Sequence, residues 1–528
     1  MGILNVLNEL RLLGITIELA GTQLKLQAPR TALSPELMRS IQENRGEIVR
    51  FLEENALVKG TSTIQPVPQQ PWYEVSHGQR RLWMAHQLAA DERTYNIPRS
   101  YKLTGTLRVD ALEWAFAELV ARHESLRTTF ILVDGELKQK VSGSGENKFV
   151  IARTDVSNDP DPEAKAQAIG QAEAATAFDL GEGPLLKTRL VRTAPDTHFF
   201  FLTLHHLISD DWSMGILIRE VLTLYNAFGK SPVNPLPPLS IQYRDYAAWQ
   251  MNQRDGEQGQ KQRQYWLDQF REPNSCLGLL ADYPRTEVNA NAGSSTMVWI
   301  DAALTRQVLD VCQRFGVSVF VMLLTLSKAL LYRYTYQTDI TLGTTVAGRQ
   351  HVELENQIGF YVSMLPLRTR FAPGDTFEGL LGKVKETAIS AFAYQAYPFD
   401  QLVEELDPAP DGGRTPFIDV VVQLIDRKQS SGTVHFADLA VASCDRPGSV
   451  SQFDLSFNFY EHPDQIALNI EFVHHLFRQE SIWILGERLL ALLRAVLNNP
   501  HGRLDDFDMA IAYEQADSEL NISDEFAF

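Results

Sequence analysis

The sequence predicts a mixed α/β protein with a small N-terminal unit and a much larger body in two successive halves. Strand-like runs alternate with amphipathic helices from residue 73 to about residue 507, without a short repeat period. Residues 58–72, rich in Pro and Gln, are predicted to be an extended linker between the two parts. The chain has 528 residues, which is too long for one ordinary hydrophobic core and favours several compact units.

The N-terminal unit is predicted to contain helices on either side of a β-hairpin. Apolar residues at helical spacing cover residues 4–13, and alternating runs at 15–19 and 24–28 flank a turn. Ser34, followed by proline, is a predicted N-cap for a helix that reaches residue 52. A hairpin in so small a unit leaves a strand edge that can accept a partner segment.

The body is predicted to contain long, regular elements in both halves. One strand leads directly into a pair of adjacent histidines, which makes this strand end the first place to look for chemistry. Helices are predicted at residues 109–123, 212–228, 317–334, 377–394 and 481–497, and strands at 125–133, 199–205, 338–345, 364–369, 420–424, 454–460 and 466–472.

Charge and cysteine content exclude several classes of partner. The formal net charge of −18 disfavours nucleic acid and anionic membrane surfaces, which repel an acidic protein. No apolar run reaches the ~20 residues that cross a bilayer, and the N-terminus has no basic leader typical of a signal peptide. Cys276, Cys312 and Cys444 are far apart and form no CxxC pair. We therefore expect free thiols, no metal site and a cytoplasmic location.

The histidine pair His205-His206 is the sharpest local feature of the sequence. Successive side chains of a strand point to opposite faces, so the two imidazoles are expected to have different roles. Imidazole can accept and return a proton near neutral pH, and the carboxylates of Asp210 and Asp211 follow closely. Packing, surface or metal-binding histidines remain alternatives from spacing alone. A second pair, at residues 474–475, has no Asp four or five residues later and is interpreted as structural.

The segments around this pair carry a family resemblance. From residue 73 to about residue 510, the chain resembles the condensation domains of nonribosomal peptide synthetases, through motifs that occur in the family's order. The matching segments are SHGQRRLW at 76–83, RHESLRTTF at 122–130, HHLISDDWS at 205–213, YRDYAAWQ at 243–250, IGFYVSMLPLR at 358–368, YQAYPF at 394–399 and RTPF at 414–417.

The resemblance implies a fold and a set of roles. It implies a chloramphenicol acetyltransferase-like fold of two lobes in a V, here residues 73–250 and 251–512, with the site in a tunnel between the lobes. His206 would position or deprotonate the attacking group, while His205 and Asp210 would be structural, with Arg349 as the expected partner of Asp210. No cofactor is expected to be bound by the chain itself. 4′-Phosphopantetheine would arrive on partner carrier proteins.

Further positions join this candidate site through the resemblance or depart from it. Trp212 and Ser213 continue the histidine motif, and Arg127 lies in a second motif, where a surface or lobe-packing role is the favoured interpretation. Asp211 replaces the family's Gly, which adds a negative side chain near the tunnel. The change could be tolerated, alter acceptor preference or weaken activity. Ser363, with the following Met, replaces the usual Asn-Thr, so acceptor preference cannot be transferred from the family.

The two ends of the chain suggest partners. Residues 1–57 resemble the TubC-like docking domains of α-β-β-α-α form, which capture an acidic segment of an upstream carrier protein on the hairpin edge. Residues 513–528 form an acidic tail that is either disordered or itself a docking segment. We expect a monomer that binds an upstream acyl or peptidyl carrier protein and an acceptor that is carrier-bound or free.

The leading hypothesis is therefore a condensation enzyme that forms an amide or ester from a carrier-bound thioester and an amine or alcohol. A recruitment platform for carrier proteins, with chemistry disabled by Asp211, is the alternative from a different class. Epimerisation, which relatives with the same histidine core perform, is a third hypothesis. The sequence does not identify the donor, the acceptor or the attacking atom.

Overall fold

The computed structural model describes most of the body and part of the N-terminal unit. Before residue 64 it describes the strands β1 (Thr16–Ala20) and β2 (Gln23–Gln27) and five helical residues between 38 and 46. From residue 64 it describes 64–88, 92–145, 149–230, 234–253, 256–272, 277–279, 281–285, 293–407, 416–426, 439–444 and 451–511. Predictions for residues 4–13, Cys276 and the acidic tail lie outside these ranges.

The predicted N-terminal hairpin is confirmed. Strands β1 and β2 pair antiparallel, with Thr16 opposite Gln27 and Ala20 opposite Gln23. Each strand is shifted by one residue from the predicted runs at 15–19 and 24–28, so two residues instead of four separate the strands.

The described residues of the N-terminal lobe form two sheets and four main helices. A five-stranded sheet has the order β14-β4-β9-β8-β7, in which β14 is Leu439–Ser443, and a three-stranded sheet has the order β3-β6-β5. Its strands are β3 (Tyr73–Glu74), β4 (Asn96–Gly105), β5 (Thr128–Val133), β6 (Glu136–Val141), β7 (Ala152–Asp155), β8 (Leu186–Ala194) and β9 (Thr197–His205). Its helices are α4 (His77–Leu88), α5 (Val109–Arg122), α6 (Pro162–Ala174) and α7 (Asp211–Ala227).

The C-terminal lobe is built on one six-stranded sheet of order β10-β16-β15-β13-β11-β12. Its strands are β10 (Gly293–Ile300), β11 (Asp339–Val346), β12 (Ser363–Arg370), β13 (Val420–Asp426), β15 (Leu455–Glu461) and β16 (Ile466–Val473). Its helices are α10 (Ala302–Phe315), α11 (Val319–Thr335), α12 (Phe377–Ala393), α13 (Phe399–Leu406) and α14 (Gln479–Asn498), and α8 (Tyr243–Asn252) and α9 (Glu257–Phe270) lead into this lobe from the first.

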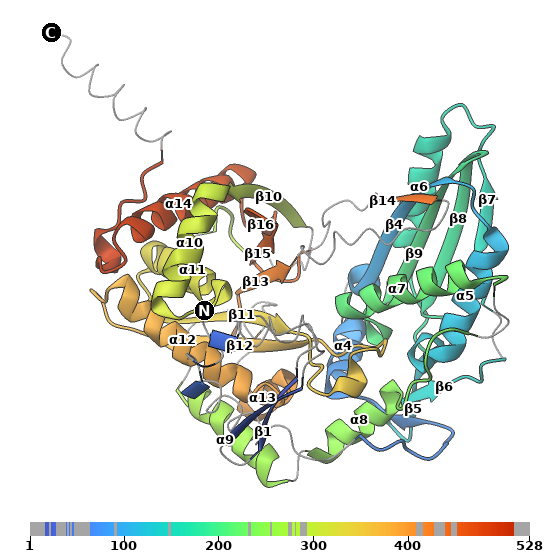
Figure 1. The fold of residues 1–528 in the computed structure, drawn as a ribbon, viewed down its shortest axis with the longest axis horizontal. Helices are drawn as coiled ribbons and strands as arrows, with labels where there is room; N and C mark the ends of the chain where they lie inside the picture. Colours follow the sequence, from blue (N-terminus) through green and yellow to red (C-terminus); the bar gives the residue numbers. More distant parts are fainter. Residues whose placement is uncertain are drawn as a thin grey trace.

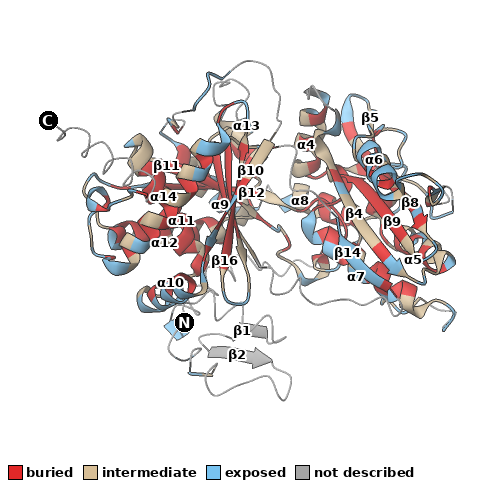
Figure 2. Cartoon of the chain, turned by 90° about the horizontal axis from the view of Figure 1, so that it is seen from above, coloured by how far each residue is buried: buried red, intermediate tan, exposed pale blue. Residues whose placement is uncertain are grey.

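The two lobes have separate hydrophobic cores and lie side by side, as Figure 1 shows. The buried residues follow the strands at the centre of each lobe, with exposed positions on the outer helix faces (Figure 2). Helix α11 is buried along nearly its whole length because its sequence is apolar on all sides, and Ser318 caps its first turn. The mixed two-lobed architecture agrees with the predicted fold class.

One strand corrects the simple division into two successive halves. β14 (Leu439–Ser443) comes from the second half of the chain but pairs antiparallel with β4, with Leu439 opposite Gly105 and Ser443 opposite Tyr101. In Figure 1 this orange strand lies next to blue β4, in the N-terminal lobe. The predicted lobe boundary at residues 250 and 251 therefore assigns this strand to the wrong lobe.

The described part of the predicted linker packs against the body. Residues 64–70 have no helix or strand, as expected, but Ile64 is buried with Tyr243 and Tyr246. The backbone N–H of Val67 donates to Asp245 Oδ1 at 2.8 Å. This segment is therefore extended but attached to helix α8, which fixes where the chain enters the large domain.

Most predicted elements are present with small shifts at their ends. The strand predicted at 125–133 begins only at Thr128, because residues 124–127 form a 3₁₀ turn. Within the described ranges, no single helix is long and apolar enough to cross a membrane. Only the pair α10 and α11, bent by 102°, meets that criterion when the two are taken together.

Candidate active site

The histidine pair lies where a buried strand ends at the junction of the lobes. β9 ends at His205, a short 3₁₀ helix covers His206–Ile208, and α7 begins at Asp211. The His205 side chain is fully buried, whereas His206 is only partly buried. The expectation that the two imidazoles have different surroundings is therefore met by the geometry.

His205 has the contacts of a structural residue. Its Nδ1 accepts a hydrogen bond from the Leu207 N–H at 3.2 Å, so the neutral ring carries its proton on Nε2. That Nε2 lies 3.4 Å from His86 Nδ1. Burial, with contributions from His86 and His206, lowers the pKa of His205 to about 3. His205 is therefore neutral at physiological pH and holds the turn that presents its neighbour.

His206 has the geometry of a general base. Its Nδ1 lies 3.2 Å from the Ser209 carbonyl oxygen, which can only accept, so Nδ1 carries the proton and Nε2 carries the lone pair. The ring meets Phe360 edge-on, with centroids 6.0 Å apart. Burial lowers the pKa of His206, and the nearby carboxylates of Asp211 and Asp210 act in the opposite direction. A neutral ring with a free lone pair can accept a proton at neutral pH.

Asp210 joins the two lobes through contacts of both carboxylate oxygens. Its Oδ1 caps α7 by accepting from the Ser213 N–H at 2.7 Å, and also accepts from Arg349 at 3.2 Å. Its Oδ2 accepts from the Tyr361 N–H at 3.0 Å. The Asp210 side chain is 3% exposed, and three donors satisfy its carboxylate. The sequence-based pairing of Asp210 with Arg349 is present.

Arg349 bonds to groups of both lobes beside Asp210. Its guanidinium donates to the Gln357 carbonyl at 2.7 Å and to Ser213 Oγ at 2.8 Å, and it lies 4.1 Å from the centroid of the Tyr361 ring. Ser213 Oγ in turn donates to the Gly359 carbonyl at 2.8 Å. Arg349 and Asp210 are both buried, so each depends on the other for its charge to be tolerated.

Asp211 and Trp212 begin α7 with exposed side chains. Asp211 is 86% exposed, and its Oδ1 accepts from Arg99 at 2.7 Å, so its charge has a partner that the sequence did not suggest. Trp212 Nε1 donates to the Glu355 carbonyl at 3.1 Å, which ties α7 to the other lobe.

Arg127 and Ser363 lie apart from the histidine motif. Arg127 donates to the Ser142 carbonyl and lies 3.6 Å from Glu124, within the N-terminal lobe, which agrees with the favoured lobe-packing interpretation. Ser363 is the first residue of β12, opposite Val346, and lines a cavity next to the site. The structure brings His205, His206, Asp210, Ser213 and Arg349 into one cluster, with Asp211 and Trp212 at its exposed edge.

Several supporting residues were not named as site candidates, although they lie in the matched motifs. Gln79 donates to the Leu207 carbonyl at 3.1 Å, directly after His206 in the chain. The Tyr243 hydroxyl donates to the Phe360 carbonyl at 2.6 Å. A Cβ at Gly359 would lie 2.1 Å from the Tyr243 ring, so only glycine allows this approach. Membership of these motifs was the available signal for their role.

The buried His123 of the N-terminal lobe contacts both α7 and the loop of residues 357–361. His123 Nε2 lies 2.8 Å from Glu220 Oε2 on α7, and His123 Nδ1 accepts from the Ile358 N–H at 3.4 Å. The loop that carries residues 357–361 is therefore fixed by contacts with both α7 and the 3₁₀ turn after α5.

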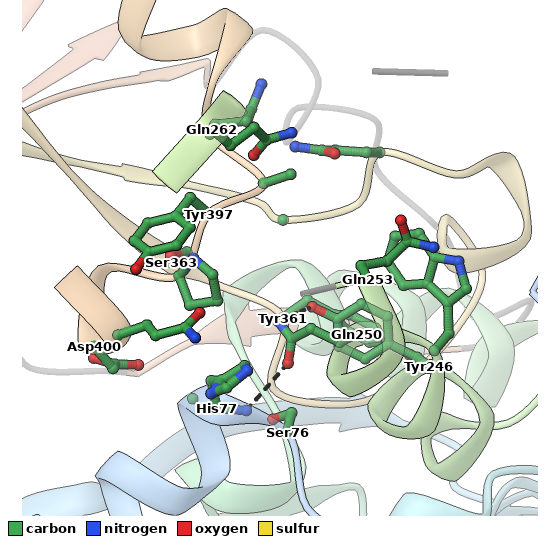
Figure 3. A pocket seen from close by; sticks show the side chains of 18 of the residues that line it. Ser76, His77, Tyr246, Gln250, Gln253, Gln262, Tyr361, Ser363, Tyr397 and Asp400 are labelled. Carbon is green, nitrogen blue, oxygen red and sulfur yellow. Dashed lines mark hydrogen bonds between the residues drawn. The ribbon is translucent and has the colours of Figure 1, made fainter. Parts of the chain in front are cut away.

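A cavity opens on the other side of Phe360. It encloses about 1270 Å³, open solvent included, and is lined largely by uncharged polar and aromatic side chains. In Figure 3, Tyr246, Gln250 and Gln253 lie on one side and Tyr397 and Asp400 on the other. The dashed line joins the His77 N–H to Gln250 Oε1 at 3.1 Å. Among the described residues, no group of three His, Cys, Asp or Glu side chains could hold a metal ion.

Comparison with known proteins gives consistent matches. The family model of the condensation domain matches residues 69–517, and that of the TubC N-terminal docking domain matches residues 3–54. Tyrocidine synthase 3 of Brevibacillus parabrevis is 35% identical over 480 residues, which is 91% of this chain but 7% of that protein. Bacitracin synthase 2 of Bacillus licheniformis is 30% identical over 513 residues, 96% of this chain and 19% of that protein. The chain thus spans a small part of these relatives.

Solved structures show the same fold at low sequence identity. The X-domain from teicoplanin biosynthesis superposes with a TM-score of 0.76 at 23% identity, covering 85% of this chain and 100% of that one. The first condensation domain of the calcium-dependent antibiotic synthetase gives a TM-score of 0.66 at 20% identity, covering 83% and 100%.

Proposed function

Since this chain belongs to the condensation-domain family of nonribosomal peptide synthetases and begins with a TubC-type docking domain, we propose that it is an active acyltransferase. The proposed reaction joins a carrier-bound acyl or peptidyl thioester to an amine or alcohol. The observation that carries the proposal is the free Nε2 of His206, in a ring kept neutral by burial. Amide formation is the activity of the family, and ester formation is the finer alternative.

In the proposed mechanism, His206 Nε2 accepts the proton of the attacking amine or hydroxyl as its nitrogen or oxygen bonds to the thioester carbon. The C–S bond of the intermediate then breaks, and the departing thiolate takes a proton from the imidazolium. His205 and Asp210 do not touch the reacting atoms; they hold the turn and the start of α7. The α7 N-terminus adds a positive partial charge where the thioester oxygen becomes negative.

The cavity next to Phe360 could admit the 4′-phosphopantetheine arm of a carrier protein with the substrate attached to it. A 4′-phosphopantetheine arm carries amide groups and no charge near its thiol, and glutamine and tyrosine side chains can bond to such groups. We propose that a carrier-borne substrate reaches His206 along this side. Ser363 would then face the arriving group from β12.

The proposal extends to partners and location. Residues 1–57 would dock an upstream acyl or peptidyl carrier protein by adding a strand to the β1–β2 hairpin. We propose a monomer acting in the cytoplasm, where Cys312 and Cys444 stay free thiols.

Deleting residues 1–57 should weaken transfer from the docked carrier protein and leave transfer from a soluble N-acetylcysteamine thioester unchanged. Equal loss with both donors would contradict a pure docking role.

The test of activity is a transfer assay with the full chain. Carrier proteins loaded with fatty-acyl and aminoacyl thioesters would be mixed with amino acids, diamines and amino alcohols, and the carrier followed by intact mass spectrometry. Loss of the acyl mass together with a new amide or ester supports the proposal. A folded chain that binds the carriers but forms no product in any combination would contradict it and favour the recruitment platform.

A further inference from the structure

An ion pair between Asp211, in the histidine motif, and Arg99, outside the matched motifs, lies next to the proposed base. Arg99, on β4, donates to Asp211 Oδ1 at 2.7 Å, and also to the Pro98 carbonyl at 3.0 Å. The two partners are 112 residues apart in sequence, and their side chains are 29% and 86% exposed. Arg99 therefore reaches from the sheet to the first residue of α7.

The position of this pair is fixed by the sheet. β4 runs antiparallel to β9, with Asn96 opposite His205 and Arg99 opposite Leu202. On its other side, β4 receives the crossing strand β14, and the Cys444 N–H donates to the Ser100 carbonyl at 2.8 Å. Arg99 thus lies where the sheet of the N-terminal lobe, the crossing strand and α7 meet.

Three charged side chains act on the His206 ring, those of Asp210, Asp211 and Arg99. Asp210 acts from the end of the same turn, but it is paired with Arg349. His205, behind it on β9, is neutral. Asp211 on α7 and Arg99 on β4 are the remaining charged pair, and they act on the ring in opposite directions. The influence of Asp211 on the ring is thus opposed by Arg99.

The pair has little to contribute to folding. Exposed ion pairs contribute little to stability, because solvent screens them and side-chain ordering costs entropy. Asp211 is also well placed without Arg99, since a carboxylate in the first turn of a helix interacts favourably with the helix dipole. Removing Arg99 should therefore mainly change the protonation of titratable groups nearby and have little effect on folding.

We propose that Arg99 is a positioning residue that holds the Asp211 carboxylate against β4 and cancels its charge, so that an acidic residue can occupy the first position of α7 without changing the charge beside His206. The inference rests on the proposed role of His206 as the base. It also accounts for the departure at Asp211, which comes with its own counter-charge.

The test measures the reactivity of the His206 ring itself, without any substrate. Diethyl pyrocarbonate modifies neutral imidazole, so its rate at His206 as a function of pH, measured by peptide mass spectrometry, gives the midpoint of protonation. Variants would be Arg99→Gln, Asp211→Asn, the double variant and Arg99→Lys. Arg192→Gln, which breaks an exposed pair with Asp155 elsewhere in the lobe, is the matched control.

Opposite shifts are expected from the two single variants. Arg99→Gln should raise the midpoint by about 0.5 pH unit, about a threefold change in the ratio of protonated to neutral ring, and Asp211→Asn should lower it by a similar amount. The double variant, Arg99→Lys and Arg192→Gln should stay close to wild type. Raising the salt concentration should shrink both shifts.

Absent shifts, or shifts in the same direction, would overturn the proposal, as would an Arg99→Lys variant that behaves like Arg99→Gln. Thermal unfolding of each variant checks that the lobe is intact. Because the readout is ring reactivity, it separates the two hypotheses: a chain that forms no product can still show the shifts, and an active chain can lack them.

Discussion

The chain has two adjacent histidine pairs, each at the end of a strand, and their surroundings differ completely. His205 ends β9 and His206 begins the following turn, next to Phe360 of the loop at 357–361 and to the buried pair of Asp210 and Arg349. His474-His475 follows β16 in an exposed turn, where the two rings mainly face each other, with centroids 3.9 Å apart. An adjacent histidine pair is therefore not a site by itself. The buried groups around the first pair give its two rings distinct roles.

The largest loss of stability should come from removing the charge of Arg349, which pairs with the buried Asp210 carboxylate beside the first histidine pair. Arg349→Met leaves the Asp210 carboxylate buried without its ion-pair partner, and should cost about 3–5 kcal/mol of unfolding free energy. Arg153→Met, which breaks an exposed pair with Glu113, should cost less than about 1 kcal/mol. Denaturant unfolding of both variants checks this, and similar losses would show that the buried link is not special.

A smaller loss of stability is expected when a side chain is added at Gly359, whose Cα packs closely against the Tyr243 ring. Gly359→Ala places a Cβ against the Tyr243 ring and should cost about 1–3 kcal/mol, because well-packed interiors do not accept added atoms. Gly382→Ala is the matched control, since that helical glycine has nothing within 4 Å and alanine favours helix. The thermal unfolding temperature should fall for Gly359→Ala and should stay level or rise for Gly382→Ala. The reverse order would contradict the packing argument.

The smallest effect should be a pH dependence from His205. Burial lowers its pKa to about 3, so the unfolded chain binds more protons at this residue between pH 6.5 and 3. The stabilisation is complete above pH 6.5 and decreases as the pH falls, by at most about 1.4 kcal/mol per pH unit. His205→Asn, which can still accept from Leu207, should flatten the melting temperature between pH 6.5 and 5. His475→Asn should leave the curve unchanged, and equal flattening would contradict the account.

The sequence predicted the elements that local patterns define. Periodicity placed α7, α12 and α14 within two residues of their observed ends, and the family resemblance implied the pairing of Asp210 with an arginine, for which Arg349 was the candidate. Contacts between distant segments could not be predicted in this way. The crossing of β14 into the first lobe and the reach of Arg99 to Asp211 depend on how the lobes fold together, and no local pattern marks either partner.

The central claim is that the first pair, and only His206 within it, supplies the base. The most direct measurement compares the single-turnover rate of acyl transfer from a loaded carrier protein in wild type, His206→Ala and His475→Ala. The account predicts a rate at least about 100-fold lower for His206→Ala, with unfolding and carrier binding unchanged, and a wild-type rate for His475→Ala. Transfer by His206→Ala at the wild-type rate would contradict it.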